Sequence, residues 1–381
     1  MNMEVTENTV LNSQEIAVME SPAAESSTRW RGPLFVIGMW RSGTSLLYAL
    51  LNKHPEIALL YEGDLLALRP LFLVPGGRER KLRRWEFWNR GLHRHGLDES
   101  RFSQADLSGM ASQAYRQYAD QKGALIAGEK SPNYFDSIAR LARDFPDARF
   151  IVIWRDPAAI CNSVLRAAKR VHSWFNRKGM CLRVLLGMQA MRTECDRLVR
   201  RGARLYELSY ESLVRNPTGT MKEICRFLEI PFIPEMASLE GADRSAIYAD
   251  GPHEQVRSER ITSSPRRTDV LPEKLKRKIT RYLAFWHETY GDRWPQIPHP
   301  QTSEGSKPSL VERVSDKVRY GYLRLLDAAV ILVYCFAPIW LLRRFRSLKH
   351  QVEEVRAKGD QAQVSSRSAA SDSPAAISHS E

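Results

Sequence analysis

One segment near the start of the chain restricts the fold more than any other. It runs from Leu34 to Leu51, LFVIGMWRSGTSLLYALL, and begins as a continuous apolar stretch typical of a strand buried on both faces. The stretch breaks at Gly38, and an apolar helical pattern resumes near Thr44. The segment therefore predicts a strand, a short loop and a helix in succession.

The loop of this segment, residues 38–45, has the outline of a phosphate-binding loop. Its sequence GMWRSGTS follows the Walker A pattern G-x-x-x-x-G-K-[ST], except that Thr44 stands where the pattern has lysine. Glycines let backbone N–H groups turn toward an anion, and the helix N-terminus adds partial positive charge. The missing lysine is the one that reaches the β- and γ-phosphates of a nucleoside triphosphate, and Arg41 supplies a basic group instead. We therefore expect an anion other than the triphosphate end of ATP or GTP.

Further along the chain, apolar runs alternate with helical patterns. Expected strands are 57–61, 125–128, 149–154 and 204–208, and expected helices include 180–201, 218–228 and 272–290. Residues 64–121 are expected to be mainly helical, and 235–271 to form a long loop or lid. We predict an α/β protein with a P-loop NTPase-like three-layer fold, in which helices cover both faces of a central parallel sheet.

Bulk composition limits the partners. A net charge of +13 and a pI near 9.6 favour an anionic partner, which could be a nucleotide, an acidic glycan, nucleic acid or an anionic membrane. The five cysteines are odd in number, widely spaced and free of any C-x-x-C pair. They predict neither a disulfide framework nor a zinc site, and they favour a reducing compartment.

The ends of the chain differ from its middle. We expect a disordered tail over 1–30 with no signal peptide, one domain over 31–294, and a Pro-rich linker over 295–308. An apolar and basic helix is expected over 309–350, followed by a second disordered tail over 351–381.

An apolar run in the C-terminal segment has two interpretations. The run AAVILVYCFAPIWLL, residues 328–342, is shorter than the roughly 18 to 20 residues that span a bilayer, and Pro338 would kink it. It could be a helix that packs against the domain or a partner. The arginines after it and its aromatic residues favour membrane contact through 320–346.

Two parts of the chain could contact an acceptor molecule. Glu62 and Asp64 follow the expected strand 57–61, at the sheet edge where open α/β folds bind ligands. The basic stretch 78–94 carries tryptophans, including Trp85. It is either a solvated amphipathic helix or a face where rings stack on a sugar or base.

Four motifs in order resemble the sulfotransferases that use 3′-phosphoadenosine 5′-phosphosulfate (PAPS). WRSGTSLL resembles the 5′-phosphosulfate-binding loop of Golgi and bacterial members, and FIVIWRDPAAICNS resembles the 3′-phosphate motif, with Arg155 and Ser163 eight positions apart. GEKSPNYFD is close to the corresponding stretch of heparan sulfate sulfotransferases, and LSYESLVRNPTGTMKEICRFLEIPF resembles the family's later strand and helix. The resemblance covers about 33–290 and extends to tyrosylprotein sulfotransferases.

The resemblance implies a donor site built around the loop. Arg41 would bind the 5′-phosphosulfate and stabilise charge on the bridging oxygen as the bond to sulfur breaks. Arg155 and Ser163 would hold the 3′-phosphate, for which arginine offers bidentate geometry. The loop residues that would hold the 5′-phosphate through N–H and hydroxyl groups are Ser42, Gly43, Thr44 and Ser45.

The resemblance also implies two groups near the acceptor. Lys130 would stand near the transferred group, and Glu62 would be the general base, with Asp64 as its competitor. Each residue has an ordinary alternative: Lys130 as a solvated cation, Glu62 as a carboxylate at a helix start, and Arg155 as an ion-pair partner of Asp156.

The chain also departs from the family. The Gly-rich basic segment of the cytosolic members is absent, and Arg260, Arg266 and Arg267 could bind the 3′-phosphate in its place. Golgi members carry an N-terminal anchor, whereas the apolar segment here is C-terminal. This favours a bacterial-type enzyme on the cytoplasmic side of a membrane.

We therefore predict transfer of a sulfuryl group from PAPS to a hydroxyl of a glycan or a lipid-linked acceptor, with no metal and no nucleic-acid partner. One alternative is a P-loop nucleotide or metabolite kinase, which would use Mg²⁺ and ATP. The other is a catalytically inactive, membrane-associated binding protein of the same fold.

Overall fold

The computed structural model describes most of the predicted domain and part of the C-terminal segment. The described residues are 30–68, 92, 95–97, 106–169, 175, 179–247, 256, 261, 271–291, 307–336, 338, 340–341 and 344. The predictions for both tails, most of the basic stretch 78–94 and most of the linker concern residues outside this set, as do those for Arg260, Arg266 and Arg267.

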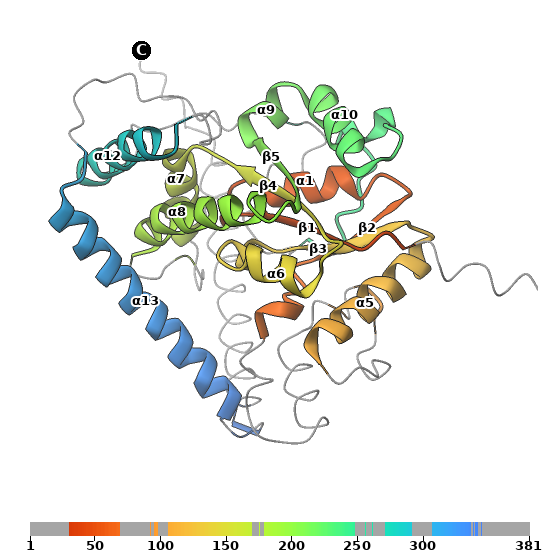
Figure 1. The fold of residues 1–381 in the computed structure, drawn as a ribbon, viewed down its shortest axis with the longest axis horizontal. Helices are drawn as coiled ribbons and strands as arrows, with labels where there is room; N and C mark the ends of the chain where they lie inside the picture. The colour runs from red at the N-terminus through yellow and green to blue at the C-terminus, as the bar shows by residue number, and fades with distance from the viewer. Residues whose placement is uncertain are drawn as a thin grey trace, which may run out of the picture.

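A sheet of five parallel strands forms the centre of the molecule (Figure 1). The strands are β1 (Pro33–Gly38), β2 (Ile57–Tyr61), β3 (Ile126–Lys130), β4 (Arg149–Trp154) and β5 (Arg204–Ser209), in the order β2-β3-β1-β4-β5. Because every neighbouring pair is parallel, the carboxyl ends of all the strands lie along one edge. The loop after β1 therefore sits at the middle of this edge.

Helices cover both faces of the sheet, because successive side chains of a strand point to opposite faces. Phe35 and Ile37 of β1 belong to one core, whereas Leu34 and Val36 belong to the other. The first core is completed by α5 (Leu107–Lys122), α6 (Ile138–Asp144), α7 (Pro157–Ala168), α8 (Met180–Val199) and α12 (Glu273–Tyr290). The second is completed by α1 (Thr44–Leu51), α9 (Tyr210–Arg215) and α10 (Pro217–Leu228). The predicted three-layer α/β architecture is confirmed.

Short sequence signals set several helix boundaries. Asp156 caps α7 by accepting a hydrogen bond from the Ala158 N–H at 2.8 Å, and Pro157 occupies the first helical position. Asn216 likewise caps α10 by accepting a hydrogen bond from the Gly219 N–H at 2.9 Å, and Pro217 occupies the first helical position. Three 3₁₀ helices complete the described elements: η2 (Leu65–Leu68), η4 (Pro132–Tyr134) and η6 (Pro234–Ala237).

Two details of the fold were not predicted from the sequence. The third strand was expected to end at Gly128, but β3 continues to Lys130, because Glu129 and Lys130 pair with both β1 and β2. The helix α9 was not predicted, since six residues are too few to show a helical period. The expectation of a mainly helical stretch over 64–121 agrees with the elements described there, which are η2, a helical Leu92 and α5.

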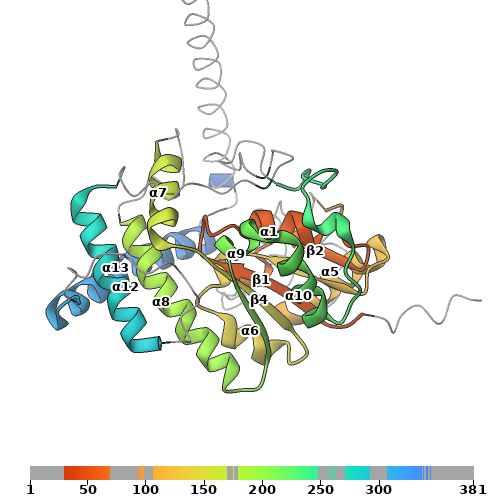
Figure 2. The same cartoon turned by 90° about the horizontal axis from the view of Figure 1, so that it is seen from above.

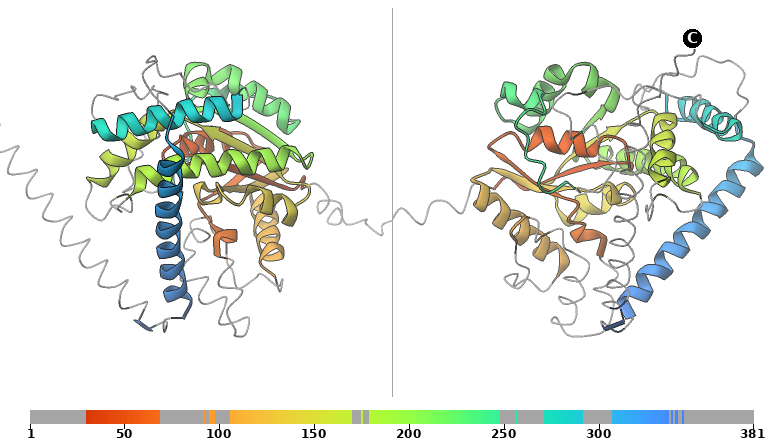
Figure 3. Two further views of the ribbon diagram at one scale, coloured as in Figure 1. Left: turned by 60° about the vertical axis from the view of Figure 1, so that its left-hand side comes forward. Right: turned by 180° about the vertical axis from the view of Figure 1, so that it is seen from behind.

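The C-terminal segment forms a long helix at the end of the molecule opposite β2 and α5. Helix α13 (Leu310–Phe336) begins well before the apolar run and lies beside α8 and α12 (Figures 2 and 3). No helix in the described part of the chain combines the length and apolarity needed to cross a membrane.

Candidate active site

The loop after β1 turns tightly into α1. Arg41 and Gly43 both adopt positive φ, 70° and 105°, and the Ser42 N–H donates to the Met39 carbonyl at 3.0 Å. Glycine is required at position 43, because a Cβ there would lie 2.4 Å from Cδ2 of Tyr210. The first-turn N–H groups of α1 have no acceptor within the helix and point to the carboxyl edge of the sheet.

The two predicted anion-binding motifs meet at this edge. The Arg41 Nε donates to Ser163 Oγ at 3.0 Å, and Nη1 of Arg155 donates to the Arg41 carbonyl at 2.8 Å. The Arg155 guanidinium lies over the ring of Tyr210, with Cζ 4.0 Å from the centroid. Sequence positions more than 110 residues apart thus form one cluster of cations and hydroxyls.

Arg155 is buried rather than a surface ion-pair partner. It is 6% exposed, and burial lowers the pKa of its guanidinium, opposed first by Tyr210 and then by Glu211. Asp156 Oδ1 caps α7, and the Asp156 charge also acts to raise the pKa of Arg155, after Tyr210 and Glu211. A buried cation facing a ligand edge is a candidate anion-binding group.

Two buried polar atoms of this cluster fit an anionic ligand. Ser42 Oγ and Arg155 Nε are both buried and make no hydrogen bond to any residue that the structure describes. A buried polar group without a partner is costly, and such groups are expected where a ligand supplies the partner. Arginine, hydroxyl and free N–H donors are the groups that bind phosphate and sulfate oxygens.

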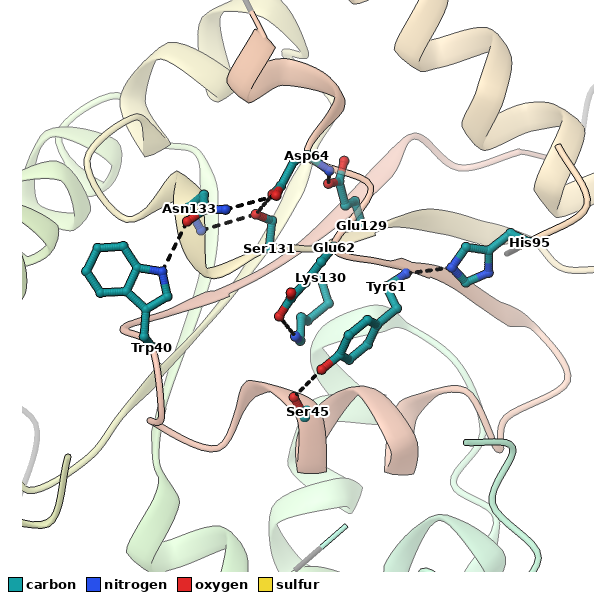
Figure 4. A network of polar contacts seen from close by, with 10 residues as sticks. All are labelled: Trp40, Ser45, Tyr61, Glu62, Asp64, His95, Glu129, Lys130, Ser131 and Asn133. Carbon is teal, nitrogen blue, oxygen red and sulfur yellow. Dashed lines mark hydrogen bonds and ion pairs between the residues drawn. The ribbon is translucent and has the colours of Figure 1, made fainter. Parts of the chain in front are cut away.

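A second cluster joins the loop to the expected acceptor side (Figure 4). Lys130 is fully buried, and its Nζ lies 2.5 Å from Oε1 of Glu62. The same Nζ lies 3.7 Å from the ring centroid of Tyr61, whose hydroxyl is 2.8 Å from Ser45 Oγ. Ser45, Tyr61, Lys130 and Glu62 therefore form a continuous polar path from α1 to a carboxylate at the sheet edge.

The environment of Lys130 keeps it charged. Burial by itself lowers the pKa of its amine, but the Glu62 carboxylate and the Tyr61 hydroxyl reverse this, so the pKa lies above its ordinary value. Lys130 is therefore not a solvated surface cation.

Glu62 and Asp64 lie in different surroundings. Both adopt positive φ, 46° and 51°, which the tight turn after β2 requires. Asp64 has both carboxylate oxygens occupied, by the Ser131 hydroxyl and by Nδ2 of Asn133 at 2.9 Å (Figure 4). Burial, and then the charge of Glu62, raise the pKa of Asp64. Asp64 thus serves a hydrogen-bond network, which leaves Glu62 as the better candidate base.

A third carboxylate lies beneath the turn. Glu129 is fully buried, and it accepts hydrogen bonds from the hydroxyls of Tyr115 at 2.8 Å and Tyr134 at 3.0 Å and from the Asp64 N–H. Burial, followed by the negative charge of Asp64, raises its pKa from 4.5 to about 8. Glu129 therefore fixes the backbone of the turn that carries Glu62.

This raised pKa predicts a pH-dependent stability. Between about pH 4.5 and 8 the folded protein holds a proton on Glu129 that the unfolded chain has released, so the free energy of unfolding falls as pH rises through this window. The expected slope from this one group is at most about 1.4 kcal/mol per pH unit. Urea unfolding from pH 5 to 8 should show a shallower slope in Glu129→Gln, whereas the exposed control Glu240→Gln should retain the wild-type slope. Equal slopes in all three proteins would contradict the assignment.

Sequence reasoning missed three residues of the site. Tyr61 ends the apolar run of β2, Tyr210 follows β5, and Glu129 was placed in a loop. The two tyrosines stand at the carboxyl ends of parallel strands, and this position was the available signal. Glu129 gave no such signal, because a charged residue inside a central strand is rare.

Within the described ranges, no cluster of histidine, cysteine, aspartate and glutamate side chains could hold a metal ion. The prediction of no metal stays a prediction.

The parallel sheet and the tight loop from β1 into α1, at the carboxyl edge, define an α/β protein with a candidate ligand site at that edge. A model of the sulfotransferase family matches residues 33–234, more than half of the 381 residues. The chain therefore belongs to the sulfotransferase family.

The curated relatives that the chain matches are named as protein-tyrosine sulfotransferases. The chain is 26% identical over 201 residues to protein-tyrosine sulfotransferase A of Caenorhabditis elegans, covering 52% of this chain and 50% of that protein. It is 29% identical over 206 residues to protein-tyrosine sulfotransferase 1 of Danio rerio, covering 52% and 53%. The chain thus spans about half the length of these relatives.

Among solved structures, the chain is similar to the sulfotransferase domain from the curacin biosynthetic pathway. That match has 18% identity and a TM-score of 0.44, and it covers 77% of this chain and 99% of the other. A mouse sulfotransferase complexed with PAP matches with 13% identity and a TM-score of 0.38, covering 76% and 89%.

Proposed function

We propose that this protein transfers a sulfuryl group from PAPS to a hydroxyl of an acceptor. The observation that carries the proposal is the joining of two clusters at one sheet edge: the buried cations and hydroxyls around Arg155, and the path from Ser45 to the Lys130–Glu62 pair. The first cluster suits a phosphorylated donor, and the second suits removal of a proton from an acceptor.

On the donor side, the proposal assigns the 5′-phosphosulfate to the loop. The first-turn N–H groups of α1 and the Ser42 and Thr44 hydroxyls would hold its oxygens, while the Ser45 hydroxyl already contacts Tyr61. Arg155 and Ser163 would hold the 3′-phosphate. Because Arg41 contacts Ser163, its guanidinium would bridge the two phosphate positions.

On the acceptor side, the proposal assigns the general base to Glu62. PAPS, when bound, supplies the sulfuryl group, whose bond to the phosphate oxygen breaks as a bond to the acceptor oxygen forms. The Glu62 carboxylate would take the acceptor proton, and Lys130 would hold that carboxylate in place through their ion pair. Lys130 would also stabilise negative charge developing near the transferred group.

We propose three acceptor classes. The names of the curated relatives favour a protein tyrosine, whereas the similarity of GEKSPNYFD to heparan sulfate enzymes favours a glycan. A lipid-linked hydroxyl is the third proposal, suggested by the apolar C-terminal segment. All three present an O–H to Glu62.

Titration calorimetry with adenosine 3′,5′-bisphosphate tests the donor site. We expect wild-type protein to bind with micromolar affinity, and Arg155→Ala and Ser163→Ala each to weaken binding by about tenfold or more, because each removes a hydrogen bond to a charged phosphate. Arg204→Ala is the matched control, since Arg204 lies at the opposite end of β5. Absence of binding to folded wild-type protein, or equal affinity of all variants, would contradict the proposal.

A further inference from the structure

Helix α13 is held to the domain through one acidic face. Asp316 accepts hydrogen bonds from Lys278 Nζ at 2.6 Å and from the Tyr282 hydroxyl at 3.0 Å, both on α12. Arg183 of α8 pairs with Asp327. The Glu312 carboxylate adds an ion pair with α12, 2.7 Å from Arg281 Nη1. Every acidic side chain between positions 310 and 329 therefore turns toward the protein.

The opposite face of α13 is apolar and exposed. Five large side chains with exposed fractions between 52% and 79% lie on it: Val311, Val314, Val318, Tyr322 and Leu325. Their spacings of three and four residues place them on one stripe of a helix with 3.6 residues per turn. A contiguous apolar stripe of this kind marks an interaction surface.

Basic side chains border the stripe. At 100° per residue, Lys317 and Arg324 fall on one side of it and Arg319 on the other, and all three are exposed. Arg324 also pairs with Asp136. The outward half of the described helix thus combines apolar residues at its centre with cations at its borders.

We propose that this outer face of α13 lies on the surface of a bilayer that contains anionic lipid. An interfacial helix of this type has an apolar face, borders rich in lysine and arginine, and acids elsewhere. The net charge of +13 supports attraction to anionic headgroups, and the sequence continues into the apolar run 328–342 and three further arginines. A second copy of the chain is a poorer occupant, because two such faces would bring their cationic borders together.

Vesicle sedimentation with the full chain tests the proposal independently of enzymatic activity. The probes are vesicles of phosphatidylcholine alone and vesicles with 30 mol% phosphatidylglycerol. We expect binding to the anionic vesicles that weakens in 0.5 M NaCl, and a loss of about tenfold or more for Val314→Asp/Val318→Asp and for Lys317→Ala/Arg319→Ala. The matched control is Val199→Asp, which changes a valine of similar exposure, 58%, on α8.

The outcomes separate the alternatives. Binding that is lost in both α13 variants and retained in the control, with unchanged circular dichroism and thermal unfolding, supports the proposal. No binding by wild-type protein, or equal binding by all variants, overturns it. A lipid-free dimer that dissociates in Val314→Asp/Val318→Asp, without vesicle binding, also overturns it and assigns the face to a second copy.

Discussion

Replacing Glu62 with glutamine is expected to lower kcat for sulfuryl transfer by about 10²- to 10⁴-fold, with little change in affinity for adenosine 3′,5′-bisphosphate. The amide keeps the size of the side chain but cannot accept the acceptor's proton. The donor cluster around Arg155 does not contact Glu62 in any hydrogen bond described above, so donor binding should persist. The measurement is transfer of ³⁵S from labelled PAPS, combined with calorimetry of the bisphosphate.

Glu56→Gln is the matched control for this variant. Glu56 lies just before β2, at the end opposite Glu62, and its replacement should leave kcat unchanged. Wild-type turnover in Glu62→Gln would refute the base assignment. If Arg41→Ala also behaved as wild type in every assay, the inactive binding protein considered from the sequence would be the better description.

The size of the Glu62 effect also bears on the acceptor. A phenol, with a pKa near 10, loses its proton far more readily than a sugar or lipid alcohol. We therefore expect a loss near the lower end of the range for a tyrosine-containing peptide and near the upper end for an alcohol. Comparing the three acceptor classes in one assay would measure this difference.

The second large effect is expected for Lys130→Met, which should lower kcat by about 10²- to 10³-fold. Methionine has a similar length and fits the apolar contact with the Tyr61 ring, but it carries no charge. Glu62 would lose the cation 2.5 Å away, and the negative charge proposed to develop near the transferred group would lose a buried cation. The measurement is single-turnover transfer with saturating PAPS.

The thermal stability of Lys130→Met should be measured together with its turnover. Methionine at position 130 leaves the partly buried Glu62 carboxylate without its ion pair, so a modest fall in Tm is expected along with the loss of turnover. Lys122→Met at the exposed end of α5 serves as the control and should alter neither quantity. A Lys130→Met protein that is folded at the assay temperature and retains full turnover would remove Lys130 from the proposed mechanism.

The sequence predicted the layers of the fold because the signals involved are local. Continuous apolar runs predicted β1, β2 and β4, and helical patterns predicted α8, α10 and α12. The end of β3 could not be predicted in this way. Glu129 and Lys130 are polar, and only their pairing with both neighbouring strands makes them part of the sheet.

The candidate site likewise has features that the sequence predicted and features that depend on tertiary contacts. The resemblance to sulfotransferase motifs implied donor-site roles for Arg41, Arg155 and Ser163, whereas their mutual contacts depend on β4 lying next to β1. The roles proposed for these residues stay predictions until the experiments above are done. The apolar C-terminal run was visible in the sequence, but the division of α13 into an acidic inner face and an apolar outer face depends on its contacts with α8 and α12.

The sequence by itself thus determined the first strand, the loop and helix that follow it, and the class of fold, because these depend on residues that are neighbours along the chain. Only the tertiary structure decided that Lys130 lies buried against Glu62, 68 positions away. The placement of β3 between β1 and β2 brings them together, and burial makes their ion pair strong enough to hold both charges in one geometry.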